Sequence, residues 1–294
     1  MSEEFDISEV YSTFDFKGFL FKLLWFWPLF LVSLGIAFAI ARFINVRKLP
    51  VFLMDNLVSI KDDQNPFFTS NTSLTFNWGG TTDKVNTSVI TLGSRTHNEE
   101  VVEHLQYYVN YQIDGEYQLV DAYKQTPFFV AVDTSYAQIL NKQFTVVFKD
   151  SVTFTLSAEF NTGTRSLQNY HTKEKSSKYF EAQNFSQDFR FGDKVRLPFL
   201  SGNFVPNTDL AVSPGATYYF SFRDFDAVVG MYNGISVMPL SKGSSVIRLR
   251  LVGQNKARLV DYLNTSVRVL SDNMLERKNL FATKTIRFID SSLS

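Results

Sequence analysis

The sequence predicts an α+β protein with one membrane-spanning helix near the N-terminus, an α/β base domain that carries a β-rich insert, and a long amphipathic helix at the C-terminal end. Three features of the sequence predict this architecture. An uncharged apolar run extends from Leu23 to Ala41, short alternating segments fill the centre of the chain, and apolar residues recur at helical spacing from Leu259 onward. The regular spacing of the short segments favours a β-sandwich or a jelly-roll-like unit for the insert.

The composition excludes several classes of function. The 29 Lys and Arg residues balance the 29 Asp and Glu residues, so no positive excess exists to drive nucleic-acid binding. The chain contains no cysteine, which rules out disulfide frameworks, thiolate metal sites and cysteine nucleophiles. The 30 Phe and 13 Tyr residues suit the half-buried surface of a sheet and therefore favour a β-rich body.

The apolar run predicts a transmembrane helix over residues 23–44. Its nineteen uncharged residues are enough, at about 1.5 Å each, to cross most of a ~30 Å hydrocarbon layer. The preceding tail, residues 1–22, is long and acidic, and no small-residue cleavage site follows the run, which argues against a cleaved signal peptide. We expect an interfacial helix around Phe16 to Lys22 in this tail. The residues expected to anchor the span in the lipid bilayer are Trp25, Trp27, Pro28, Arg42, Arg47 and Lys48.

Residues 45–108 are expected to form the first part of the base domain. Leu49–Ile60 has the apolar character of a first strand, and Ser73–Trp78 alternates like a second one. A helix with the sequence THNEEVVEHLQYYV follows, and Thr96 or Asn98 is its expected N-cap. Its buried face is expected to carry Val101, Leu105 and Tyr108.

The same helix carries the only residues with the spacing of a metal site. His97, Glu100 and His104 fall at positions i, i+3 and i+7, which places them on one face. Two imidazoles and a carboxylate can bind zinc, but the spacing differs from the HExxH motif of zinc proteases. An acidic, solvated helix face explains the same pattern. We therefore predict no metal site and keep these three residues as the candidates for one.

Residues 109–230 are predicted to form the β-rich insert. Val152–Phe160 alternates strictly, so one of its faces should be buried and the other wet. Its expected buried residues are Val152, Phe154, Leu156, Ala158 and Phe160. Further strands are expected at Tyr107–Ile113, Phe128–Val132, Gln143–Phe148 and Thr217–Phe222. Aromatic residues on such strands pack a core, and the alternative role for some of them is contact with sugar rings.

Residues 231–294 are predicted to return to the base domain. A strand region spans Ile235–Leu251, and Gly253 to Asn255 opens a helix longer than about 50 Å. The helix has no glycine cap or proline stop before Ser294, so we expect it to continue into a longer chain. The apolar stripe expected to pack this helix, or to join copies of the chain, consists of Leu263, Val267, Leu270, Met274, Phe281 and Phe288.

Sequence motifs for catalysis are absent. No GxxxxGK[ST] phosphate loop, no GxGxxG after a strand and no GxSxG elbow occurs in the chain. We therefore predict no catalytic residues and no cofactor, and we do not expect this segment to be an enzyme.

The order of the parts resembles a known family. The match includes FKGFLFKLLWFWPLFLVSLGIAFAI, the segment Asn45–Pro50, LGSRTHNEEVVEHLQYYVNYQ at Leu92–Gln112, TPFFVAVD at Thr126–Asp133, and the strand and long helix of Ser244–Ser294. In these features the chain resembles the Wzz/Wzc polysaccharide co-polymerases, particularly the Bacteroidetes forms fused to a tyrosine autokinase. One departure is Lys256, where the family often has proline.

The resemblance implies a location and a role. It implies an inner-membrane protein of a Gram-negative bacterium with a cytoplasmic N-terminus and a periplasmic main domain, although a count of cations beside the span favours the opposite orientation. It also implies a ring of identical copies that regulates the chain length and export of capsular or exopolysaccharide. The implied partners are a polysaccharide polymerase and an outer-membrane export protein, and a longer parent would add a second span and a tyrosine kinase.

Two other interpretations stay open at this point. The chain could be a single-pass periplasmic subunit of another envelope machine, such as a secretion adaptor or a motility component. It could also be a membrane-tethered zinc enzyme that uses His97, Glu100 and His104.

Overall fold

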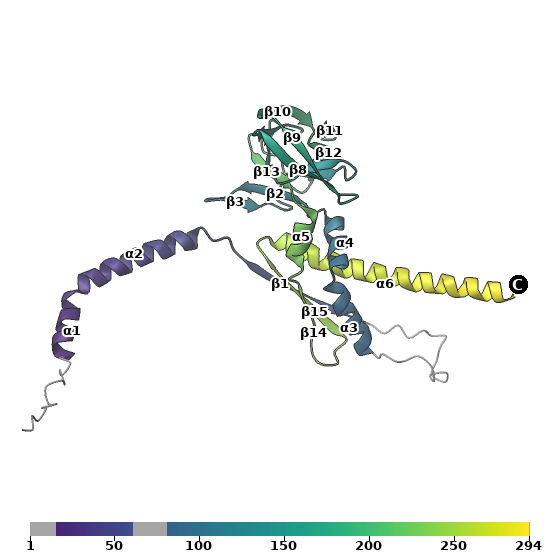
Figure 1. Ribbon diagram of the computed structural model, residues 1–294, viewed down its shortest axis with the longest axis horizontal. Helices are drawn as coiled ribbons and strands as arrows, with labels where there is room; N and C mark the ends of the chain where they lie inside the picture. The colour runs from purple at the N-terminus through teal and green to yellow at the C-terminus, as the bar shows by residue number, and fades with distance from the viewer. Residues whose placement is uncertain (1–15, 61–80, 294) are drawn as a thin grey trace, which may run out of the picture. The chain divides into compact units, whose positions relative to one another are not determined.

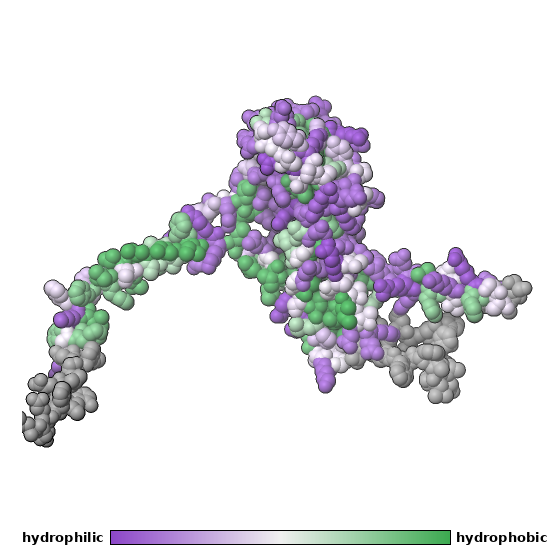
Figure 2. Space-filling model, viewed as in Figure 1, coloured by the Kyte–Doolittle hydropathy of each residue, from purple (hydrophilic) through white to green (hydrophobic). Residues whose placement is uncertain are grey.

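The N-terminal unit consists of two helices. The computed structural model describes residues 16–60 and 81–293, so the predicted strand Ser73–Trp78 lies outside the described residues. Helix α1 (Phe16–Trp25) is followed by α2 (Trp27–Val46) (Figure 1). Within the described part of the chain, α2 is the one helix long and apolar enough to cross a membrane. None of its residues is buried against the protein, and Figure 2 shows apolar residues along almost all of it.

The predicted single span of residues 23–44 is interrupted. Phe26 lies in a turn between the two helices, with its N–H still 3.3 Å from the Lys22 carbonyl oxygen, and the membrane-length helix begins at Trp27 with Pro28 in its first turn. A proline has no N–H to donate and its ring crowds the carbonyl four residues earlier, so a continuous helix through Leu24 and Pro28 is unfavourable. The membrane-length helix runs to Val46, two residues beyond the predicted end of the span.

A three-stranded antiparallel sheet forms the centre of the base. Its strand order is β1 (Phe52–Ser59), β15 (Val246–Gly253) and β14 (Ser236–Pro239). β1 pairs along its whole length with β15, although almost two hundred residues separate them in the sequence. The inner face carries the buried residues Ile247, Leu249 and Leu251 of β15. Helices α3 (Thr81–Leu92) and α6 (Lys256–Leu293) pack against this sheet.

Three helices of the base differ from the expectations. The N-cap of helix α4 (Arg95–Leu105) is Ser94, two residues before Thr96 and four before Asn98, and its hydroxyl accepts from the His97 backbone N–H. Helix α3 was not expected, and its residues Val85 and Leu92 are buried. Helix α5 (Phe225–Tyr232) was also missed, although Asp224 caps it by accepting from the Ala227 N–H.

The insert contains three further antiparallel sheets. Their orders are β10-β7-β6-β13-β2-β3, β11-β12-β4 and β5-β8-β9. The strands are β2 (Val109–Asp114), β3 (Leu119–Asp121), β4 (Phe128–Val132), β5 (Ala137–Ile139), β6 (Phe144–Phe148), β7 (Thr153–Phe160), β8 (Gly163–Asn169), β9 (Lys175–Phe180), β10 (Gln183–Arg190), β11 (Lys194–Leu197), β12 (Leu200–Pro206) and β13 (Thr217–Phe222). The six-stranded sheet meets the other two through aromatic side chains. From Pro50 onward, insert and base form one compact unit.

The alternation of β7 is confirmed except at its start. Phe154, Leu156, Ala158 and Phe160 are buried, whereas Val152 is half-exposed. Val152 precedes the strand and lies in a turn, where its N–H donates to the carboxylate of Asp150. The turn fixes its direction, so the period-two pattern of the strand does not apply to it.

Phenylalanine fills the space between the sheets of the insert. Phe128 of β4 lies 5.7 Å from Phe204 of β12, and Phe204 lies 4.7 Å from Phe154 of β7, measured between ring centroids. Phe144 and Phe220 stack at 5.1 Å across β6 and β13. All five rings are buried. The high aromatic content therefore reflects core packing rather than an exposed platform for sugar rings.

A close backbone contact in the insert gives a testable prediction. Gly202 of β12 pairs with Val132 of β4, and a Cβ at Gly202 would lie 2.7 Å from the carbonyl oxygen of Ala131. Gly202→Ala is expected to lower the free energy of unfolding by about 2 kcal/mol, because that oxygen cannot retreat without disturbing the ladder. Urea unfolding in detergent measures the change. The control Gly230→Ala lies in open space on α5 and is expected to be neutral or stabilising. Equal effects of the two substitutions would contradict the clash.

Candidate functional site

The first half of α6 is the helix on which the base is built. Asn255 caps it, because its side-chain oxygen accepts from the Arg258 N–H. α6 packs against β1, β15 and α4. In this half the predicted stripe is confirmed as a packing face, since Leu263 and Leu270 are buried and Val267 and Met274 are partly buried against the core.

The second half of α6 leaves the core. Phe281 is 74% exposed and Phe288 is 72% exposed, so these two residues of the stripe do not pack within this chain. The physical reason is length. The helix has 38 residues and extends about 57 Å, whereas the base sheet ends near Met274. Figure 2 shows apolar residues between polar ones along this part of α6. The exposed apolar residues of this half are Leu275, Leu280, Phe281, Ile286 and Phe288. Only Phe281 and Phe288 of these lie on the side of the helix that continues the core stripe, and we call them the free apolar face of α6.

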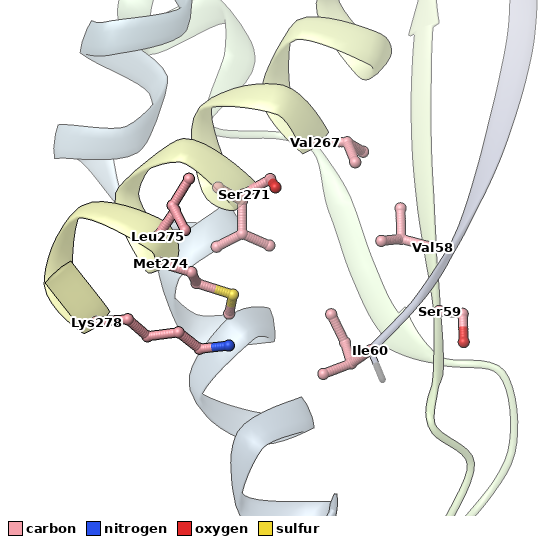
Figure 3. Close-up of a pocket in the computed structure, with 9 residues that line it drawn as sticks. Val58, Ser59, Ile60, Val267, Ser271, Met274, Leu275 and Lys278 are labelled. Atoms are coloured by element: carbon pink, nitrogen blue, oxygen red, sulfur yellow. The ribbon is translucent and has the colours of Figure 1, made fainter. Parts of the chain in front are cut away.

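An open groove lies where the free apolar face begins. It has a volume of about 420 Å³ and lies between α6 and the end of β1 (Figure 3). Val58 and Ile60 line it from the β1 side, and Val267 and Met274 line it from α6. Lys278 lies at one end and is the one charged side chain among the described residues that line the groove. The lining is thus mostly aliphatic and suits an apolar side chain better than a polar substrate.

The three metal candidates are not brought together. His97 is only 2% exposed and faces α6, where its Nε2 lies 2.8 Å from Ser266 Oγ. Glu100 is exposed and accepts from the side-chain amide of Asn273 at 2.7 Å, and His104 is exposed. Among the described residues, no group of three His, Cys, Asp or Glu side chains is arranged to hold a metal ion. Positions i, i+3 and i+7 lie on one broad face of α4. Because α6 packs against only part of that face, His97 is buried while Glu100 and His104 remain exposed to solvent.

Burial makes the contribution of His97 to folding stability depend on pH. Its Nδ1 is buried and has no hydrogen-bond partner, and burial lowers the pKa of the ring. The unfolded chain, with an ordinary pKa of about 6.5, therefore binds a proton that the folded chain does not. The contribution of neutral His97 to stability is fully present above that pH and is lost as the pH falls below it.

We therefore expect acid to destabilise the protein partly through His97. Between about pH 7.5 and about pH 5.5, the free energy of unfolding of the wild type should fall more than that of His97→Gln, which cannot titrate. Urea unfolding in detergent at each pH measures both. The same loss in the two proteins would show that His97 has no part in it.

A buried polar cluster joins α6 to the insert. Arg258 of α6 donates to both oxygens of Asp121 in β3, at 2.8 and 3.2 Å. Its guanidinium lies 4.8 Å from the ring centroid of Tyr107 and 4.6 Å from that of Tyr123. The Tyr123 hydroxyl donates to Asp261 at 2.8 Å. We call Tyr107, Asp121, Tyr123, Tyr232, Arg258 and Tyr262 the junction cluster.

The tyrosines of the junction cluster connect the remaining helices. Tyr232 of α5 and Tyr262 of α6 stack with centroids 4.1 Å apart and planes inclined by 6°. The Tyr262 hydroxyl donates to the side-chain oxygen of Asn98 in α4 at 2.6 Å. Burial raises the pKa of Tyr232 to about 12, so it stays protonated at neutral pH. Sequence reasoning missed this cluster, because its members come from distant segments and no short motif connects them.

The expected anchor residues lie around α2. Trp25 and Trp27 are exposed on either side of the break at Phe26, and the Arg47 guanidinium lies over the ring of Phe43. The length and composition of α2 fit a membrane anchor and a signal sequence alike. Comparison of the sequence with protein-family models and with curated proteins finds no match.

Proposed function

We propose that the chain is the membrane-anchored and periplasmic part of a polysaccharide co-polymerase. In this proposal α2 crosses the inner membrane of a Gram-negative bacterium and the N-terminus is cytoplasmic. The unit from Pro50 onward forms an α/β base with a sandwich-like insert. The chain acts as a scaffold that regulates the length and export of capsular or exopolysaccharide, through a polymerase and an outer-membrane exporter, and it does no catalysis itself.

The observation that carries this proposal is the free apolar face of α6. Phe281 and Phe288 are more than 70% exposed there, although they continue the stripe by which the first half of α6 packs against the core. Soluble proteins rarely leave such a series uncovered, and it is typical of protein–protein contacts. Near the groove at Met274, one chain offers both a protruding apolar helix and an apolar recess. A contact between two different surfaces of identical chains closes into a ring when the rotation permits.

The junction cluster supports a scaffold role. Arg258 and Asp121 hold β3 of the insert to the start of α6, and Tyr232 and Tyr262 add α5. The insert therefore moves with the helix that carries the proposed contact surface. A rigid connection of this kind would hold the inserts of neighbouring copies at a fixed spacing, as a length-regulating scaffold requires.

The test is the polysaccharide made by a deletion strain that carries plasmid-borne variants. The double variant Phe281→Asp, Phe288→Asp should shift the length distribution on a gel toward that of the deletion strain, because two carboxylates would lie in the contact. The control Thr283→Asp adds one carboxylate on the side of α6 away from Phe281 and Phe288 and should keep the wild-type distribution. If deletion of the gene leaves the distribution unchanged, the proposed function is wrong.

A further inference from the structure

The base sheet has one face that none of the described helices covers. Residues of β1 alternate between the inner and the outer side, so Leu53, Asp55 and Leu57 project outward while Phe52, Met54 and Val58 pack inward. Leu53 and Leu57 are more than half exposed, and so is Val252 of β15. Met238 of β14 is half-exposed on the same side. The three strands lie side by side in Figure 1.

The register collects these aliphatic side chains into one patch. Leu53 is paired with Val252, and Leu57 is paired with Arg248, which is paired in turn with Met238. We call Leu53, Leu57, Met238, Val252 and Arg248 the outer-face patch. Isolated exposed apolar residues need no explanation, but a cluster across three strands of one sheet face indicates a contact surface.

The charge of this face is positive. Within the three described strands Asp55 is the one acidic residue, and Arg250 donates to both oxygens of that carboxylate at 2.8 and 3.0 Å. With Asp55 neutralised by Arg250, Arg248 is left as a net positive charge beside Leu57 and Met238. Aliphatic side chains with interspersed cations are the composition of surfaces that bind anionic lipid.

The chain length limits how far β1 can be from a membrane. Only residues 47–51 separate the end of α2 from the start of β1, and an extended chain of that length reaches about 20 Å. Arg47 and Lys48 in this connection are also cations. If α2 crosses a bilayer, the first strand of the base therefore begins close to the headgroups.

We propose that the outer-face patch docks onto the surface of an anionic lipid bilayer, with its aliphatic residues at the headgroup boundary and Arg248 near lipid phosphates. The proposal rests on the proposed membrane anchoring by α2. A second copy of the chain fits this face less well. A symmetric contact would place two Arg248 side chains in one apolar layer, whereas anionic headgroups neutralise them. Docking would fix the tilt of the base and so the direction in which α6 extends.

The absence of native cysteine allows a direct test with single nitroxide labels on the full chain in liposomes. Labels at Leu53→Cys and Leu57→Cys probe the patch. Leu34→Cys in α2 reports the span, and Tyr179→Cys on the exposed strand β9 reports bulk water. In phosphatidylcholine mixed with phosphatidylglycerol, the accessibility of the patch labels to a water-soluble nickel chelate should be several-fold lower than that of Tyr179. Their accessibility to oxygen should approach that of Leu34.

The outcomes separate the two proposals. Patch labels as accessible to nickel as the Tyr179 label, beside a lipid-buried Leu34 label, overturn docking and leave the anchor intact. A water-accessible Leu34 label overturns the anchor. Protection of the patch should weaken several-fold in phosphatidylcholine alone and in Arg248→Gln. Protection that is insensitive to lipid charge, but lost when the protein is diluted with excess lipid, means that another copy covers the face, and this also overturns docking.

Discussion

Replacing Asp121 with alanine is expected to lower the free energy of unfolding by about 3 kcal/mol. The substitution leaves the Arg258 guanidinium without its carboxylate, and the Arg258 side chain is only 14% exposed. It also removes the acceptor of the Tyr123 backbone N–H. An uncompensated charge beside two tyrosine rings has little access to water, so its desolvation is not repaid. Urea unfolding of the full chain in detergent measures the loss.

Two controls make the Asp121 prediction specific. Asp188→Ala breaks the ion pair between Asp188 and Lys149, and both of these side chains are about half exposed. It should change the free energy of unfolding by less than about 1 kcal/mol. The double variant Asp121→Leu, Arg258→Met removes both charges together and should recover a large part of the loss. The junction cluster would lose its assigned role if Asp121→Ala were no more destabilising than Asp188→Ala.

Leu270→Asp is the second substitution with a large expected effect. Leu270 is buried at the contact of α6 with the base, and an aspartate there would be buried without a partner. A cost of about 4 kcal/mol is expected, from the lost packing and the desolvated carboxylate together. Thermal unfolding followed by circular dichroism measures it.

The matched substitution lies further along the same stripe. Phe281→Asp introduces the same charge at an exposed position, so it should change the unfolding of a single chain by less than about 0.5 kcal/mol. It should instead weaken association between copies, measured as the mass of the detergent-solubilised protein. Equal stability losses for Leu270→Asp and Phe281→Asp would mean that the division of α6 into a packed and a free half is wrong.

Local pattern predicted the strands that are buried on one face. β4 and β13 have the expected bounds, and β7 differs by one residue, because apolar alternation reports directly on a sheet that faces a core. β9 shows why other strands were missed. Its sequence KSSKYF is exposed at all but the last position, so the hydrogen-bond ladder with β8 holds it and no hydrophobic period exists to be read.

The candidate site was predictable to a similar extent. The spacing of apolar residues predicted the stripe of α6, but spacing cannot show where the opposing sheet ends, so it did not distinguish Leu270 from Phe281. For the metal candidates, the spacing placed the three residues on one side of α4 but could not show which of them is buried. Packing of α6 decides that, because Ser266 of α6 contacts His97. The pairing of Arg258 with Asp121 joins residues 137 positions apart and depends on the tertiary fold alone.

The central claim is that α2 crosses the membrane, stays attached to the chain, and holds the unit from Pro50 onward outside the cytoplasm. A phosphatase that is active only in the periplasm, fused after Asn45, tests it most directly. We expect active enzyme that remains in the membrane fraction after alkaline carbonate extraction. Inactive enzyme would place the body in the cytoplasm, and active enzyme released into the soluble fraction would identify α2 as a cleaved signal; either result contradicts the claim.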